Sequence, residues 1–255
     1  MRKTFVGPQG SGKSTIAINT LWALDKILRH VNSNMGDGAK LRALLADLTP
    51  EGTTSDYNVT DRSMVRYPLK TKDRVAEYVE LVRNPHATPK YIRKQSSNYD
   101  LAFIDTSSAK PDHVDEVMKV SDSIILVTTS DDDVNLLLGF LKRAQKANPR
   151  VRLDQIVLNR FTDFVDYGRR REQFEKTSLR KILEMKGFDI EKYVSTLPSS
   201  QRLNRYCEKK VPAFPDDRAD DPQMYDLFGE FTQNLIESRR LPLVKDLVAS
   251  IEKRL

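Results

Sequence analysis

The sequence has few of the residues that build disulfides and zinc sites. Its 255 residues include one cysteine, Cys207, and three histidines, so no disulfide can form within the chain and a zinc site is not expected. A long hydrophobic run is also missing, since none approaches the length of about 18 residues that marks a membrane-spanning helix. The first residues lead directly into a predicted strand and a glycine-rich loop. We therefore expect no membrane span and no cleaved signal peptide, and we expect a cytoplasmic location.

The charge balance leaves two kinds of polyanionic partner open. The sequence has 42 lysine and arginine residues against 36 aspartate and glutamate residues, a formal net charge of +6. This excess permits attraction to nucleic acid or to anionic lipid without requiring either. Hydrophobic residues make up 39% and charged residues 31% of the chain, which is typical of a globular protein of one α/β domain at this length.

The strongest motif lies near the N-terminus. Residues 7 to 14 read GPQGSGKS and match the P-loop pattern G-x-x-x-x-G-K-[ST] at every fixed position. Glycines let such a loop aim several backbone N–H groups at one phosphate, a lysine reaches the β- and γ-phosphates, and a serine hydroxyl suits Mg²⁺. The residues expected to contact the nucleotide here are Gly7, Pro8, Gln9, Gly10, Ser11, Gly12, Lys13, Ser14 and Thr15. We predict that this protein binds a nucleoside triphosphate.

Two aspartates follow short apolar runs that read as buried strands. Asp47 ends the run 41–46, and Asp105 ends the run 101–104, which has the form of a Walker B strand. Because ligands bind at the carboxyl ends of parallel strands, we expect both carboxylates near the P-loop. Asp105 would hold the water shell of Mg²⁺ beside Ser14. For Asp47, a role as an acidic cap of a turn or helix remains an alternative.

Strand and helix signals alternate through the rest of the chain. After a loop over 31–38, we predict strands over 123–128, 155–158 and 193–198. We predict helices over 111–120, 134–147, 167–186, 201–209, 224–239 and beyond Pro242. The least legible part, residues 55–98, contains a candidate strand over 63–69 and a helical pattern over 73–82, and we interpret it as an insertion or a pair of helices. The pattern predicts one domain over residues 1–255, a doubly wound, mostly parallel sheet with helices on both faces.

Three charged or amphipathic segments have two readings each. Asp131, Asp132 and Asp133 precede the helix over 134–147. Acidic residues at this place complement the helix dipole, and we prefer this interpretation to a metal site. The helix over 167–186 carries a basic face that could grip nucleic acid or simply be solvated; its residues are Arg169, Arg170, Arg171, Lys176 and Arg180. The terminal segment 242–255 is amphipathic, and we expect it to dock on its own domain rather than on a membrane.

Several further segments, taken in order, resemble the ParA/MinD group of P-loop ATPases. Residues 44–52 (LLADLTPEG) are similar to the family's strand and Asp-x-Asp-Pro-Gln-Gly segment, and residues 99–106 (YDLAFIDT) to its "IDT" strand. Residues 120–127 (VSDSIILV) resemble the strand that follows, and residues 211–214 (VPAF) the turn before the last helices. Asn159 and Pro198 match positions that hold the adenine base in relatives. The similarity runs along most of the chain.

The resemblance implies an ATPase that uses ATP and Mg²⁺ and forms a homodimer in the ATP-bound state. Lys13, Asp47 and Asp105 would be its catalytic residues, and Ser14, Asp47 and Asp105 would hold the metal and its water shell. Members of this family bind nonspecific DNA or membrane, and a partner protein stimulates hydrolysis. They act in plasmid and chromosome partition, division-site placement and cargo positioning, and some are encoded near conjugation systems.

Two departures from the family pattern leave the rate of hydrolysis open. The family's signature lysine, which reaches the partner's phosphates across the dimer, is replaced by Pro8, so the Walker A motif is an ordinary one. The second aspartate of Asp-x-Asp, which helps to orient the attacking water, is replaced by Thr49. Glu51 or Asp47 could substitute, or turnover could be slow. A small-molecule kinase or synthetase, or a nucleotide-gated scaffold with little hydrolysis, are the alternatives.

Overall fold

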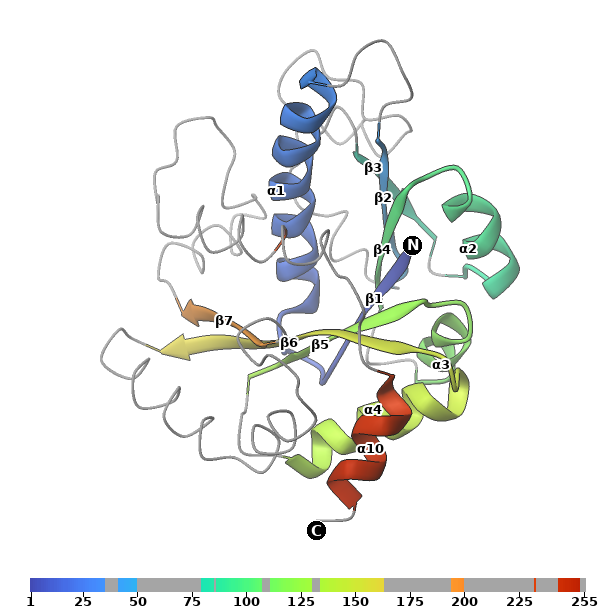
Figure 1. Cartoon of the computed structure of the whole chain (residues 1–255), viewed down its shortest axis with the longest axis vertical. Coiled ribbons are helices and arrows are strands. Elements are labelled where there is room, and N and C mark those ends of the chain that lie inside the picture. Colours follow the sequence, from blue (N-terminus) through green and yellow to red (C-terminus); the bar gives the residue numbers. More distant parts are fainter. Residues whose placement is uncertain are drawn as a thin grey trace.

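A parallel sheet of seven strands runs through the described part of the protein (Figure 1). The computed structural model describes residues 1–34, 41–49, 79–84, 86–106, 111–129, 134–162, 194–199, 232 and 243–252. The strands are β1 (Arg2–Val6), β2 (Ala43–Asp47), β3 (Val79–Arg83), β4 (Leu101–Asp105), β5 (Ser123–Thr128), β6 (Arg152–Thr162) and β7 (Val194–Ser199). Their order is β3-β2-β4-β1-β5-β6-β7, and each pairing is parallel. The predicted doubly wound α/β fold is confirmed.

Helices cover the sheet on both faces (Figure 1). One side carries α1 (Lys13–Asn34), and the other carries α3 (Pro111–Met118), α4 (Val134–Ala147) and α10 (Val244–Glu252), while α2 (Pro89–Ser96) lies beside the β2–β4 half. The apolar runs of the sequence form strands buried on both faces, as parallel sheets require, and every residue of β2 and β5 is buried. The face under α3, α4 and α10 forms a single apolar cluster with these helices.

The position of β1 determines where the functional site lies. β1 pairs with β4 on one side and β5 on the other, so it lies in the middle of the sheet. The P-loop, which follows β1, therefore starts from the middle of the sheet's carboxyl edge. The carboxyl ends of the neighbouring strands, at Asp47, Asp105 and Thr128, share the same edge because all of these strands are parallel. This edge is the place where open α/β sheets bind their ligands.

The terminal helix docks on the domain, as the sequence predicts. Val244, Leu247 and Val248 of α10 are buried in the cluster that contains Leu141 of α4, and Lys142 of α4 forms an ion pair of 2.8 Å with Glu252. The described apolar residues of this helix therefore pack against their own domain. Among the described helices, none is long and apolar enough to cross a membrane.

Two sequence predictions are wrong at their ends. The helix predicted over 73–82 is contradicted from Val79 onward, because Val79–Arg83 forms β3 and pairs with β2; a short alternation of apolar and charged residues fits either period, and pairing with β2 decides it. The loop predicted over 31–38 begins later, since α1 continues to Asn34. The Asn32 side chain donates to Leu41 O (3.0 Å) and accepts from Leu41 N (2.9 Å), which clasps the helix to the chain entering β2.

Several predictions concern residues outside those that the structure describes. They are the strand over 63–69, the aspartates at 131–133, the helices over 167–186 and 201–209, and all of the helix over 224–239 except Thr232. The basic residues Arg169, Arg170, Arg171, Lys176 and Arg180 belong to this group. Their contact with nucleic acid stays a prediction, as does the extent of the single domain over 1–255.

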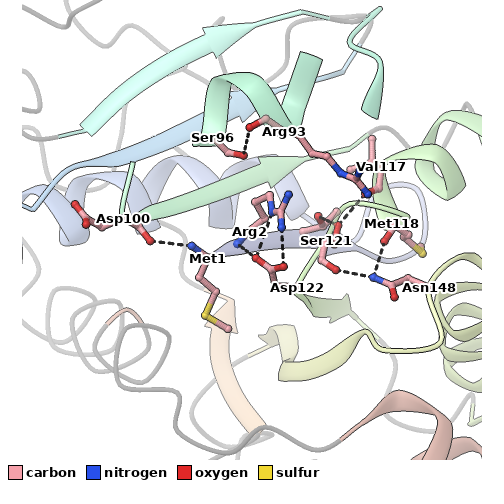
Figure 2. Close-up of polar contacts among 11 residues, drawn as sticks. Met1, Arg2, Arg93, Ser96, Asp100, Val117, Met118, Ser121, Asp122 and Asn148 are labelled. Atoms are coloured by element: carbon pink, nitrogen blue, oxygen red, sulfur yellow. Dashed lines mark hydrogen bonds and ion pairs between the residues drawn. The ribbon is translucent and has the colours of Figure 1, made fainter. Parts of the chain in front are cut away.

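Polar contacts connect the strands at the amino-terminal edge of the sheet, opposite the P-loop (Figure 2). The Arg2 guanidinium and backbone N–H all donate to the Asp122 carboxylate, at 2.7 to 3.2 Å. Burial alone would raise the pKa of Asp122, but these hydrogen bonds and the positive charge of Arg2 hold it below its usual range. The Met1 ammonium donates to Asp100 O (2.9 Å), and the Asn148 amide donates to Ser121 O (2.8 Å). These contacts fix the starts of β1, β4 and β5 against one another.

A buried ion pair joins β1 to β6 inside the sheet's core. Lys3 Nζ lies 2.5 Å from Asp154 Oδ2, with the two side chains 0% and 1% exposed, and the Ser123 hydroxyl of β5 donates to the same oxygen at 3.0 Å. Burial lowers the pKa of Lys3, and the charge and hydrogen bond of Asp154 oppose this shift. The pair bridges across β5, the strand that lies between its two partners.

Candidate nucleotide-binding site

The P-loop connects β1 to α1 in a tight, glycine-dependent turn. Gly10 and Gly12 have φ angles of 76° and 91°, a region that other residues rarely adopt. Ser11 N donates to Pro8 O at 3.3 Å within the turn, and Ile16 N donates to Gly12 O at 2.9 Å as the helix begins. The N–H groups of a first helical turn have no acceptor within the helix, so the loop and the start of α1 together form an anion-binding end.

Close packing adds a second reason for two of the glycines. A Cβ on Gly7 would lie 2.0 Å from the Val127 carbonyl oxygen of β5, and a Cβ on Gly12 would lie 2.2 Å from Asn159 Nδ2 of β6. The loop therefore packs closely against β5 and β6. A Cβ on Gly10, in contrast, would meet nothing within 4 Å among the described residues, so the loop is open on that side.

Lys13 is folded into the loop that it follows. Its side chain is 7% exposed, and Nζ donates to Pro8 O (2.8 Å) and Gly7 O (3.2 Å). Burial lowers the pKa of Lys13, and the negative charge of Asp105 opposes this shift. The ammonium thus lies at the centre of the loop, close enough to Asp105 for their charges to interact.

The two predicted aspartates lie side by side at the carboxyl edge. Asp47 and Asp105 occupy the same register on β2 and β4, Asp105 is in register with Phe5 at the end of β1, and both carboxyl groups are buried. Leu48 N donates to Asp105 O at 3.0 Å, so the chain leaving β2 is tied to the end of β4. Two carboxylates next to a lysine and a phosphate loop form a donor set that fits a hydrated Mg²⁺ ion.

One oxygen of Asp47 is already engaged by Thr49. The Thr49 backbone N–H (2.9 Å) and hydroxyl (2.6 Å) both donate to Asp47 Oδ1, and both residues are buried. The turn after β2 thereby holds the carboxylate in one orientation. This agrees with the alternative role of Asp47 as the acidic cap of a turn.

Sequence reasoning missed two polar contacts that shape the loop. Asn159 Nδ2 donates to the carbonyl oxygen of Ser11, at 2.8 Å, and Thr106 Oγ1 donates to Phe5 O at 2.7 Å, which fixes the end of β1 against β4. Both partners are distant in sequence, so no local pattern announces them. The base contacts predicted for Asn159 and Pro198 stay a prediction; Pro198 lies in β7, in register with Phe161 of β6.

The remaining predicted residues line the open side of the loop. Gln9 and Gly10 are exposed, while Pro8, Ser14 and Thr15 are half-buried, so the loop's outer surface is accessible to a ligand. The loop, the helix behind it and the two aspartates on adjacent strands have the arrangement of a P-loop nucleoside triphosphatase fold.

Solved structures share this architecture over nearly the whole chain. MinD from Aquifex aeolicus superposes with a TM-score of 0.60 at 15% identity, covering 95% of this chain and 99% of its own. The ATP complex of a McdA variant from Cyanothece gives 0.59 at 12% identity, covering 94% and 98%, and a ParA family ATPase from Chlorobium tepidum gives 0.53 at 18%, covering 91% and 97%. The chain has the fold of the MinD and ParA ATPases. Sequence comparison found no matching family model and no matching curated protein.

Proposed function

We propose that the protein is a Mg²⁺-dependent ATPase of the ParA/MinD type whose ATP-bound homodimer acts in DNA or plasmid partition or in cargo positioning. The observation that carries this proposal is the buried Lys13 ammonium, held by the P-loop carbonyls beside the register-matched pair Asp47 and Asp105. Two chains of the same fold support the ligand: the McdA variant is an ATP complex, and MinD from Pyrococcus horikoshii is a complex with Mg-ADP.

Each residue of the site has a role that follows from its position. Lys13 exchanges the loop carbonyls for phosphate oxygens and neutralises their charge. Ser14, in the first turn of α1, supplies a hydroxyl ligand for Mg²⁺, and Asp105 accepts hydrogen bonds from the water shell of the ion. Asp47, in register with Asp105 at the same edge of the sheet, helps to orient water. Mg²⁺, when bound, screens the phosphate charge that would otherwise resist attack by water.

The finer parts of the proposal are the dimer and its partners. A MinC:MinD complex from Aquifex aeolicus shows that a MinD chain of this fold binds a partner protein. By analogy, the ATP-bound form of this chain dimerises, a partner stimulates hydrolysis, and the basic segment with Arg169, Arg170 and Arg171 meets nonspecific DNA. The net charge of +6 is consistent with that last contact.

A nucleotide-gated scaffold with little hydrolysis is the second candidate. Thr49 stands where the family pattern has a water-orienting aspartate, and its two hydrogen bonds occupy Asp47 Oδ1. Pro8 stands where the family has its signature lysine. With both groups missing, hydrolysis is expected to be slow, because phosphoryl transfer depends on positioning and on charge neutralisation.

The decisive experiment measures ATP affinity and ATPase rate for the wild type and Lys13→Ala, each with and without double-stranded DNA. Nucleotide binding that Lys13→Ala abolishes, together with ATP-dependent DNA binding or DNA-stimulated turnover, supports the ATPase proposal. Tight binding with undetectable turnover favours the scaffold, and turnover that appears only with an added metabolite favours a small-molecule kinase. An ATP affinity that Lys13→Ala leaves unchanged would refute the site itself.

The basic segment needs a separate measurement. DNA affinity is followed against salt concentration for the wild type and for Arg169→Ala/Arg170→Ala/Arg171→Ala. If these arginines bind phosphates, the variant binds DNA more weakly, and the slope of log affinity against log salt flattens by about one for every phosphate that it no longer neutralises. An unchanged slope shows that these arginines form a solvated face.

A further inference from the structure

Asn159 reaches the phosphate loop from the opposite half of the sheet. It lies near the carboxyl end of β6, just before an irregularity in the β6–β7 register between Asn159 and Phe161. Such irregularities redirect a side chain out of the regular alternation of a strand. The Asn159 side chain is 6% exposed, and its Nδ2 lies 2.8 Å from Ser11 O.

The amide sits directly against the backbone of the loop. A Cβ on Gly12 would lie only 2.2 Å from Asn159 Nδ2. The asparagine can therefore pack here only because residue 12 is a glycine. The contact joins residues 148 positions apart in sequence. Asn159 is thus the neighbour that Gly12 accommodates, and its amide supports the loop from the side of β6.

The hydrogen bond fixes one peptide plane of the loop. In a trans peptide the carbonyl and the following N–H point in opposite directions, so holding Ser11 O toward β6 turns the Gly12 N–H away from β6. A loop that binds phosphate works by pointing its N–H groups at the anion and its carbonyls elsewhere. Without this donor, Ser11 O would be free to rotate inward, where its partial negative charge would repel phosphate.

We propose that Asn159 is a positioning residue of the phosphate loop, which acts on the triphosphate through Ser11 and Gly12 rather than on the base. The inference rests on the proposed nucleotide binding, and it differs from the base contact that the sequence resemblance implies for Asn159. A residue that reads the base affects ATP alone. A residue that shapes the loop affects every ligand that carries the same phosphates.

The test compares ligands with and without a base. Titration calorimetry measures the affinities of Mg-ATP, Mg-GTP and Mg-tripolyphosphate for the wild type, Asn159→Ala and the nearly isosteric Asn159→Asp. For each variant we expect the affinity for all three ligands to fall by a similar factor, on the order of tenfold, because one hydrogen bond that orients the loop is removed. Asn159→Asp is expected to be the weaker binder because its carboxylate repels Ser11 O.

A matched control removes a hydrogen bond elsewhere on the same half of the sheet. The Ser195 hydroxyl of β7 donates to Gln155 Oε1 of β6 at 2.9 Å, and Ser195→Ala should leave all three affinities unchanged. A second readout, without any ligand, is amide hydrogen exchange at Gly12 and its neighbours, which should quicken in the Asn159 variants and stay unchanged in Ser195→Ala. Exchange that quickens at the loop while the strands keep their protection identifies a loosened loop rather than a misfolded protein.

Different results separate this inference from the proposed function. Loss of ATP affinity with tripolyphosphate affinity unchanged overturns the inference and assigns Asn159 to the base, while nucleotide binding itself stands. Unchanged affinities for all ligands, with unchanged exchange at Gly12, also overturn it. A wild-type protein that binds none of the three ligands overturns the proposed function and the inference together.

Discussion

Thr49 donates two hydrogen bonds to a single oxygen of Asp47, from its backbone N–H at 2.9 Å and from its hydroxyl at 2.6 Å. Thr49, which departs from the Asp-x-Asp pattern, therefore contacts Asp47, which matches the first aspartate of that pattern. Two donors on one carboxylate oxygen hold the side chain in a single rotamer. The Asp47 carboxylate is therefore held in a fixed orientation at the end of β2.

We expect Thr49→Val to loosen Asp47 without changing the shape of the turn. Valine keeps the branched side chain and the backbone hydrogen bond but has no hydroxyl donor. A hydrogen bond to a buried charged group contributes about 1.5–3 kcal/mol, so the free energy of unfolding should fall by about that amount in chemical denaturation. Thr49→Ser keeps a hydroxyl donor, so it should retain most of the wild-type free energy of unfolding. An unfolding midpoint for Thr49→Val equal to that of the wild type would contradict the contact.

The pKa of Lys13 predicts how the protein responds to alkaline conditions. Burial lowers this pKa although Asp105 opposes the shift, so between the lowered value and the usual lysine value of about 10.4 the unfolded chain binds more protons than the folded one. Stability should therefore rise with pH across that window, and the rise should be smaller in Lys13→Met. Denaturation curves at several alkaline pH values measure both slopes. ATP affinity should fall over the same window as the ammonium is deprotonated, and parallel slopes for both proteins would refute the prediction.

Gly7 and Gly10 of the P-loop should differ in their tolerance of alanine. In Gly7→Ala the new Cβ would lie 2.0 Å from a backbone oxygen, that of Val127, which cannot move without distorting β5. A Cβ on Gly10 meets nothing within 4 Å among the described residues, so Gly10→Ala carries only the strain of its positive φ, about 1–2 kcal/mol. Urea denaturation should show a much larger loss of stability for Gly7→Ala. Equal losses would mean that backbone conformation alone requires these glycines.

The buried pair Lys3–Asp154 should behave differently when it is broken than when it is replaced. Lys3→Met leaves the Asp154 carboxylate buried without its cation, and breaking a buried pair in this way costs about 3–5 kcal/mol. Lys3→Met/Asp154→Leu removes both charges, so its stability should return to near that of the wild type. A double-mutant cycle from denaturation curves measures the coupling. Additive losses of stability would show that the two charges do not interact.

Much of the fold could be predicted because its strands are short apolar runs. The strands that end at Asp47 and Asp105 are visible in the sequence, and their shared register follows from the rule that parallel strands end at one edge. α3, α4 and α10 follow from helical spacing of apolar residues. The strand Val79–Arg83 could not be predicted in this way, because five residues that alternate between apolar and charged fit a helical turn as well as an edge strand.

The polar contacts could not be predicted because their partners are far apart in sequence. Lys3 and Asp154 look like surface residues in a one-dimensional pattern, and only the neighbouring position of β1, β5 and β6 makes them a buried pair. Asn159 is expected at the site only through the resemblance to the ParA/MinD group, as a contact of the base. Its contact with Ser11 depends on the path of the P-loop across β6, which no local propensity encodes.

The clasp between Asn32 and Leu41 has a mechanical consequence for the site. α1 starts at the P-loop and is about 33 Å long at 1.5 Å for each of its 22 residues, and the clasp anchors its far end to the entrance of β2, the strand that ends in Asp47. Sliding of the helix along its axis would break both hydrogen bonds of the clasp. The P-loop and Asp47 are therefore linked a second time, through α1, the clasp and β2, in addition to their link through the sheet.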